Sequence, residues 1–221
     1  MRDTRKEKEY FDKYLDYQYS RIEKKTAKLK NSDESKKQRV LVSLTGYELD
    51  LLKAEFSVGA TKDNVKALMN RAIKLVSEYA NITYEDLLNL ISLSIMVRDH
   101  SEVAKMIKLH NEKIRNDRLL NYLSMYANDE VPIWDMSIPL KKEFSALDEV
   151  MNAEPKEDKL CNYLNNWYEN HSDYSWYNSH LRSEDTYCGY WSFESAAIAI
   201  ILGLNENELK ASEYFPSFDE D

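Results

Sequence analysis

The stretch from 171 to 191 holds many of the side chains in this chain that could bind or react. It reads HSDYSWYNSHLRSEDTYCGYW and combines two histidines, one cysteine, several acids and many aromatic rings. His171, His180, Cys161 and Cys188, with Asp173 or Asp185, could hold a zinc ion, and a hydrolase would use His171, His180 and Asp185. Either cysteine could also be a nucleophile beside a histidine. Their spacing matches no familiar zinc pattern, and a Cys–His pairing arises easily by chance. We therefore expect no metal, no cofactor and no catalytic residue, with a small metal-dependent hydrolase as the alternative.

Paired carboxylates in the same stretch favour binding over catalysis. Glu184 and Asp185 could share acid and base roles, but nothing in the sequence indicates a cleft that would separate their pKa values. No glycine-rich phosphate loop occurs, so nucleotide chemistry has no support. Rigid aromatic rings among acids suit recognition of a basic protein surface. The candidate contact residues are Asp173, Trp176, Tyr177, His180, Glu184, Asp185 and Tyr187.

Charge is distributed unevenly along the 221 residues, whose formal net charge is −9. Residues 1–39 carry a net charge of +5, whereas residues 143–221 carry −13. Such an acidic region repels nucleic acid and speeds encounter with basic partners, although acids also simply keep a protein soluble. We expect a protein partner and no direct binding to nucleic acid.

The sequence gives no sign of a membrane segment. The longest apolar run, from Ala196 to Leu202, is far shorter than the roughly 20 residues that span a bilayer, and the N-terminus lacks an apolar signal core. Two cysteines are too few for a disulfide framework. We expect a cytoplasmic protein that is a monomer or a weak homodimer.

Composition favours helices. Only four Gly and four Pro occur, which leaves little material for the tight turns of a many-stranded sheet. We expect an all-α fold, a multi-helix bundle in two coupled halves. Residues 1–130 form the N-terminal helical region, 131–139 a connector that contains Pro132 and Pro139, and 140–221 an acidic helical region.

Hydrophobic periodicity and capping signals place the helices of the N-terminal region. Residues 5–30 show a helical pattern with Tyr10, Tyr14 and Tyr17 on its apolar stripe, and 31–39 is expected to be a linker. Thr45 followed by Glu48 resembles a capping box that begins the next helix. Two more helices are expected to start at Thr61 and at Thr83, and shorter ones over 101–111, 118–126, 140–151 and 155–170.

The stretch GYWSFESAAIAIILGL, residues 189–204, predicts a buried helix. Ser192 is the expected N-cap, Glu194 lies in the first turn where the helix dipole favours an acid, and Gly203 is the expected C-terminal stop. The residues between them are apolar on all sides, so we expect the central helix of the C-terminal half. Trp191, next to this helix, is expected in the core.

The run TYCGYWSFESAAIAIILGLNENELK, continued by EYFP, resembles the C-terminal signature of PoNi-type immunity proteins, the antidotes to PoNe nuclease toxins of bacterial polymorphic toxin systems. The resemblance covers residues 187–216. Its structural signature is Gly189, Tyr190, Trp191, Glu194 and Gly203.

The resemblance implies an all-helical cytoplasmic protein that binds and blocks a co-produced toxin, typically a basic DNase. Inhibition by occlusion of the active site and docking beside it both stay open. A helical scaffold or regulator with an unrelated partner is a further alternative. If the loop is not the interface, the helical face around Glu48, Glu55 and Asp63 is the next candidate.

Overall fold

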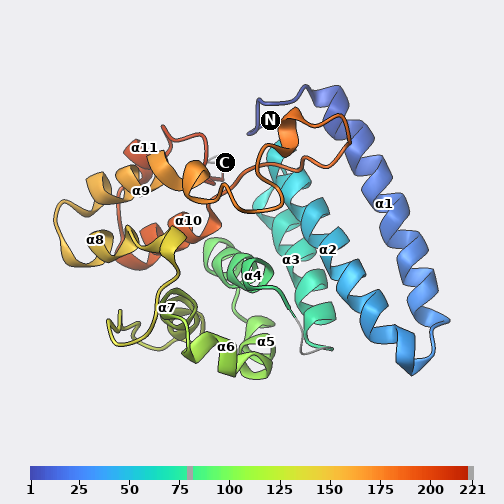
Figure 1. The fold of residues 1–221 in the computed structure, drawn as a ribbon, viewed down its shortest axis with the longest axis horizontal. Helices are drawn as coiled ribbons and strands as arrows, with labels where there is room; N and C mark the ends of the chain where they lie inside the picture. Colours follow the sequence, from blue (N-terminus) through green and yellow to red (C-terminus); the bar gives the residue numbers. More distant parts are fainter. Residues whose placement is uncertain (79–81, 219–221) are drawn as a thin grey trace. The chain divides into compact units, whose positions relative to one another are not determined.

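The computed structural model describes residues 1–78 and 82–218, which form eleven α-helices, two short 3-10 helices and no strand (Figure 1). The predicted all-α class is confirmed. The described residues gather into two compact units that alternate along the chain: Met1–Leu90 with Asn178–Gly189, and 91–177 with the residues from 190 onward. The boundary proposed at 131–139 stays a prediction.

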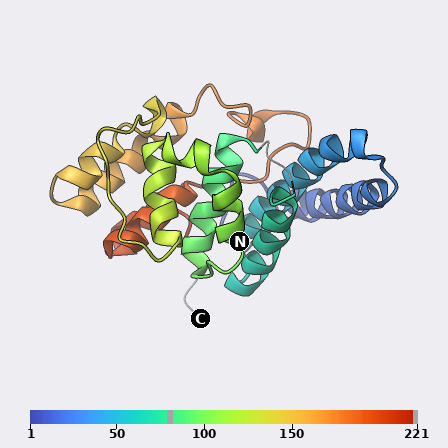
Figure 2. The ribbon, with the colours of Figure 1, turned by 90° about the horizontal axis from the view of Figure 1, so that it is seen from below.

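The first unit consists of long helices and one late segment of the chain. These helices are α1 (Lys8–Lys30), α2 (Glu34–Val58), α3 (Lys62–Val76) and the beginning of α4 (Tyr84–Val97). α2 packs against α1 and against α3 (Figures 1 and 2). α1 buries Phe11, Tyr14, Gln18 and Ile22, which recur at helical spacing. Tyr17 is 55 % exposed, so its predicted place on the buried stripe is wrong.

α2 corrects two expectations from the sequence. Asp33 caps it by accepting a hydrogen bond from the backbone N–H of Lys36 at 3.1 Å, and the helix runs unbroken to Gly59, whose φ of 104° ends it. Residues 34–39 are therefore helical, and Thr45 lies inside the helix rather than at its start. The physical reason is that 34–45 contains no Gly or Pro, so the earlier Asp33 cap nucleates one long helix.

Two other capping predictions are confirmed. The hydroxyl of Thr61 accepts from the N–H of Asn64 at 3.3 Å and begins α3. The hydroxyl of Thr83 accepts from the N–H of Asp86 at 3.1 Å and begins α4. The apolar stripe of α3 is buried at Val65, Leu68, Met69, Ala72 and Val76, while Leu75 is half-buried.

The second unit contains shorter helices. They are the rest of α4, α5 (Val103–Leu109), α6 (Asn111–Arg115), α7 (Arg118–Ala127), η1 (Lys142–Phe144), α8 (Leu147–Asn152), α9 (Lys156–Asn170), α10 (Phe193–Leu202) and α11 (Glu206–Leu209). α10 packs against α7, and α9 packs against α8 and α11. No helix among the described residues is long and apolar enough to cross a membrane.

α10 lies in the core of this unit, as its composition predicted, but only over its first two turns. Residues 193–199 are buried, whereas 200–202 are half-exposed. Gly203 ends the helix with a φ of 65°, and the N–H of Leu204 bonds to the carbonyl of Ala199 at 2.9 Å. This is the Schellman stop that was expected. Ser192 occupies the N-cap position, yet its side chain does not cap the helix.

The segment 128–141 has no helix and is held by one arginine. Arg118 donates from Nε to the carbonyl of Ile138 at 2.9 Å and from Nη2 to the carbonyl of Met136 at 3.0 Å. Its Nη1 forms an ion pair with Asp148, which also accepts from Nε1 of Trp134 at 2.8 Å. These bonds fix the path of a segment that carries Pro132 and Pro139.

The burial of α10 predicts the effect of a charge placed in it. Ala197 is fully buried, so Ala197→Asp puts an unpaired carboxylate in the core and should lower the free energy of unfolding by on the order of 3 kcal/mol. Ile201→Asp, on the half-exposed last turn, is the matched control and should cost clearly less. Urea denaturation compares the two. Equal losses would show that the two turns are buried alike.

Candidate functional site

The seven predicted contact residues divide between the two units. Asp173, Trp176 and Tyr177 belong to the second unit, and the chain then enters the first unit at Asn178. The late segment of the first unit, Asn178–Gly189, contains the other four: His180, Glu184, Asp185 and Tyr187. The aromatic and acidic stretch is therefore two separate groups, each positioned by its own unit.

The late segment is anchored to the start of the chain by Tyr187. The Tyr10 hydroxyl donates to the carbonyl of Tyr187 at 2.9 Å and accepts from its N–H at 3.0 Å, while the Tyr187 hydroxyl bonds to the carboxylate of Asp3. Burial, with the neighbouring Asp3 charge, raises the pKa of Tyr187 far above its ordinary value. In Figure 1 this segment, with η2 (Ser179–Leu181), lies beside the first turns of α1. Tyr187 is fully buried, so its predicted role as a contact residue is corrected to a core role.

The acids of this segment are on the surface. Glu184 and Asp185 are both exposed, and His180 is half-buried with its ring 6.0 Å from that of Tyr187. The pKa of Lys13 on α1 is raised chiefly by its bond to Glu9 and to a smaller extent by Asp185. Asp185 thus lies near α1, and both exposed carboxylates can contact a partner.

The second group belongs to an aromatic cluster around α9. Trp176 stacks on Trp167 with ring centroids 5.3 Å apart, and it also contacts Tyr168, His171, Tyr174 and Tyr190. Because Trp176, a predicted contact residue, is half-buried in this cluster, truncating it would also lower stability. Asp173 is exposed, and the half-buried Tyr177 donates to Glu169 at 2.9 Å.

Glu194 is the polar centre of the second unit. It is 3 % exposed, and its Oε1 accepts from the hydroxyl of Tyr163 at 2.5 Å, from Nε1 of Trp167 at 2.7 Å and from the hydroxyl of Ser192 at 2.6 Å. The last bond explains why Ser192 does not cap α10. Of the other signature residues, Tyr190 and Trp191 are buried, and Gly189 has a φ of 115°.

The residues of the alternative hydrolase do not come together within one unit. His171 is buried in the second unit, with its Nδ1 2.6 Å from the carbonyl of Trp167, whereas His180 and Asp185 belong to the first. Burial, followed by nearby Asp50, raises the pKa of the Cys188 thiol to about 12, which disfavours a thiolate nucleophile. No group of three metal-ligating side chains is found in the part of the chain that the structure describes.

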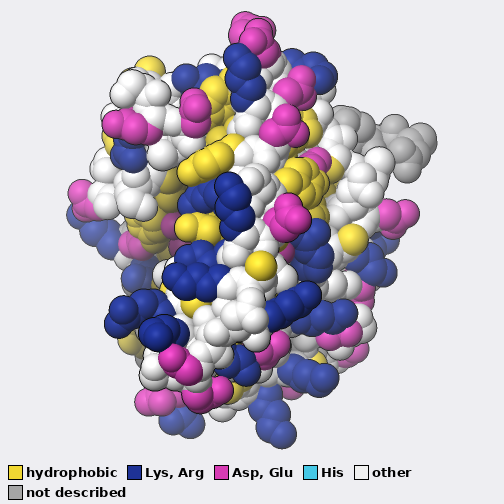
Figure 3. Space-filling view, turned by 90° about the vertical axis from the view of Figure 1, so that its right-hand side faces the viewer, with side chains coloured by type: hydrophobic (Ala, Val, Ile, Leu, Met, Phe, Trp, Pro, Cys, Tyr) yellow, Lys and Arg dark blue, Asp and Glu magenta, His cyan; other side chains and the backbone are white. Residues whose placement is uncertain are grey.

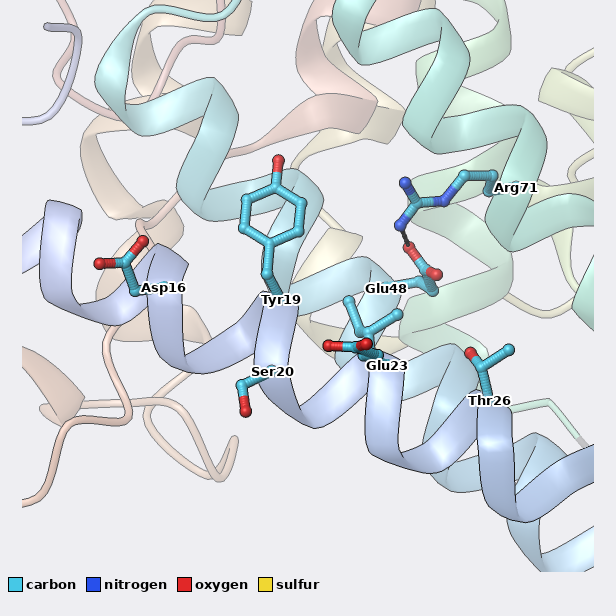
Figure 4. Close-up of a pocket in the computed structure, with 8 residues that line it drawn as sticks. Asp16, Tyr19, Ser20, Glu23, Thr26, Glu48 and Arg71 are labelled. Carbon is cyan, nitrogen blue, oxygen red and sulfur yellow. Dashed lines mark hydrogen bonds and ion pairs between the residues drawn. The ribbon is translucent and has the colours of Figure 1, made fainter.

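A pocket in the first unit was not predicted as such. It lies between α1, α2 and α3, with a volume of about 790 Å³ (Figure 4). Its lining residues are Asp16, Tyr19, Ser20, Ile22, Glu23 and Thr26 of α1, Glu48 of α2 and Arg71 of α3. The spacing of the α1 residues by three and four was visible in the sequence, but only the fold brings Glu48 and Arg71 beside them.

Glu48 gives this pocket an unusual carboxylate. It is 5 % exposed, and its partner is Arg71, whose side chain is 47 % exposed. Burial raises the pKa of Glu48, and Arg71 offsets part of the rise. The Tyr19 hydroxyl donates to Glu55 at 2.6 Å, and burial followed by that bond raises the pKa of Tyr19 to about 12.

The surface around α1 is mixed in charge. Lys and Arg side chains are spread over the face that carries this helix, with apolar and acidic side chains between them (Figure 3). The lining of the pocket contains three carboxylates and one cation, Arg71. This excess of acids is confined to the pocket and does not extend over the surrounding surface.

Comparisons with known proteins match both halves of the chain. Residues 2–108 match a family model described as PoNe immunity protein (PoNi), N-terminal, and residues 115–218 match one described as PoNe immunity proteins (PoNi), C-terminal. No curated protein matches the chain. The crystal structure of protein PA2201 from Pseudomonas aeruginosa is similar with a TM-score of 0.70 and 13 % identity, over 91 % of this chain and 84 % of that one. At this identity the likeness shows the fold alone.

The bonds at Glu194 predict a stability defect. Glu194→Gln keeps the shape but weakens three hydrogen bonds to a buried carboxyl oxygen, and should lower the free energy of unfolding by about 2 kcal/mol. Glu169→Gln, which changes an exposed bond to Tyr177, is the control and should cost little. Urea denaturation measures both. Parent-like stability of Glu194→Gln would contradict the role assigned to this carboxylate.

Proposed function

The chain belongs to the family of PoNe immunity proteins (PoNi), and we propose that it binds and neutralises a cognate PoNe nuclease toxin. The observation that carries this proposal is the match of both family models, in order, over 2–108 and 115–218. Protection would take place in the cytoplasm, where a nuclease meets the DNA of the producing cell.

Charge supports a nuclease as the partner. A DNase that holds phosphates needs Lys and Arg on its binding surface. The chain has a net charge of −9, and residues 143–221 alone carry −13. Opposite net charges raise the rate of encounter and disfavour wrong partners of like charge.

Inhibition by binding, without catalysis, agrees best with the side chains. The buried His171 bonds to a backbone carbonyl, and the Cys188 thiol is held protonated by burial. The exposed acids, in contrast, are free to meet a basic surface. Glu184 and Asp185 on the first unit and Asp173 on the second are the predicted residues that we retain as contact candidates, with Tyr177 and His180 half-buried beside them.

Binding kinetics can test the contact surface. The double variant Glu184→Lys with Asp185→Lys should slow association with the nuclease domain of the cognate toxin, by roughly tenfold at low salt, because it removes steering charge. Raising the salt should shrink the difference, since the Debye length is only about 8 Å at physiological ionic strength. Surface-immobilised binding at two salt concentrations measures both rates.

A matched control separates local contact from net charge. Glu34→Lys with Glu78→Lys makes the same charge change at two other exposed acids of the first unit and should alter association less. Survival of cells that express the toxin gives a second readout. If the parent neither binds nor protects, the proposed function is wrong. If both double variants behave alike, the late segment is not the contact surface.

A further inference from the structure

The pocket between α1, α2 and α3 has the chemistry of a receptor for a cationic side chain. Asp16, Glu23 and Glu48 contribute carboxylates, and the half-exposed ring of Tyr19 forms part of its wall (Figure 4). A cation gains from carboxylates at its charged end and from an aromatic face along its stem. Ile22 adds an apolar patch that would cover the methylene groups of a long side chain.

Glu48 shows that the pocket is electrostatically incomplete. An ionised carboxylate can accept about four hydrogen bonds, and a buried one ordinarily has several donors. Among the described residues, the donor to Glu48 is Arg71, at Oε2, and Oε1 is not one of the buried atoms without a partner, so it is accessible to a group that enters the pocket. Glu194 in the second unit, by comparison, has three donors. The buried carboxylate of Glu48 therefore has capacity for one more cationic donor.

We propose that this pocket receives one Arg or Lys side chain of the toxin, so that α1, α2 and α3 supply a second contact beside the late segment. This inference rests on the proposed function. Within the first unit the two places lie along the same helix, since Asp185 acts on Lys13 and Asp16 follows one turn later. A guanidinium or ammonium group entering the pocket would meet Glu48 and the acids of α1 together.

If the charge of Glu48 serves binding and not folding, removing it should weaken toxin binding without lowering the stability of the fold. Because burial raises the pKa of Glu48, the folded state holds its proton to higher pH than the unfolded chain does, and stability falls as the pH rises through that window. At neutral pH Glu48→Gln should therefore leave the melting temperature unchanged or higher. The same variant should weaken toxin binding on the order of tenfold or more, mainly through faster dissociation.

Charge reversal at the two α1 acids that line the pocket, Asp16 and Glu23, is the second test. Asp16→Lys with Glu23→Lys should weaken binding at least as much, whereas the Glu34→Lys with Glu78→Lys control should not. If the parent binds the toxin and both pocket variants bind like it, the inference is wrong and the proposed function stands. If the parent does not bind, the proposed function itself fails, and this inference with it.

Cross-linking identifies what enters the pocket. A photoreactive benzoylphenylalanine at Ser20, in the pocket lining, should capture the toxin, and the cross-linked toxin peptide should contain an Arg or Lys. The same replacement at Ser43, equally half-buried on α2 but absent from the lining, is the control. Capture at Ser43 and not at Ser20, or a peptide without a cationic residue, would overturn the assignment.

Discussion

The hydrogen bonds of Tyr187 with Tyr10 and Asp3 are the constraint on which the first unit depends. They join pairs of residues that lie 177 and 184 positions apart in the sequence, so the first unit is complete only when the late segment has returned to it. Closing so long a loop costs chain entropy that grows slowly with length. Burial of the Tyr187 ring beside Phe11, and the Arg5–Asp3 ion pair behind its hydroxyl, offset this cost. The acids at 184 and 185 are consequently held on a fixed segment beside α1.

The second unit depends in a similar way on a buried acid with phenolic and indole donors. Glu194 links α9, through Tyr163 and Trp167, to the start of α10 through Ser192. Asp3 and Glu194 are both nearly inaccessible to solvent and well supplied with donors. Such satisfied carboxylates stabilise a fold and offer nothing to a partner. Glu48 is also buried, but its partner is one half-exposed arginine, Arg71. This difference distinguishes Glu48, a candidate contact residue, from the two structural acids.

Charge acts at two ranges in this protein. The acidic region 143–221 contributes a long-range field that favours encounter with a basic partner. The pocket acts only at contact, within a region whose first 39 residues carry a net charge of +5. The net charge of this region therefore does not indicate a site for a cation beside α1, whereas the burial and hydrogen bonding of Glu48 do. If the partner is the basic toxin proposed above, the field would increase the rate of encounter and the local contacts would provide discrimination.

The sequence by itself determined the all-α class, the caps at Thr61 and Thr83, the buried start of α10 and its stop at Gly203, because helix periodicity and capping are local. It also carried the family signature. It misplaced the start of α2, because a capping box inside a long helix looks the same as one at its start. Only the tertiary structure decided that the stretch 171–191 divides between two units, that Tyr187 lies in a core, and that Glu48 and Arg71 meet beside α1. These outcomes depend on contacts between residues far apart in the chain, which no local pattern encodes.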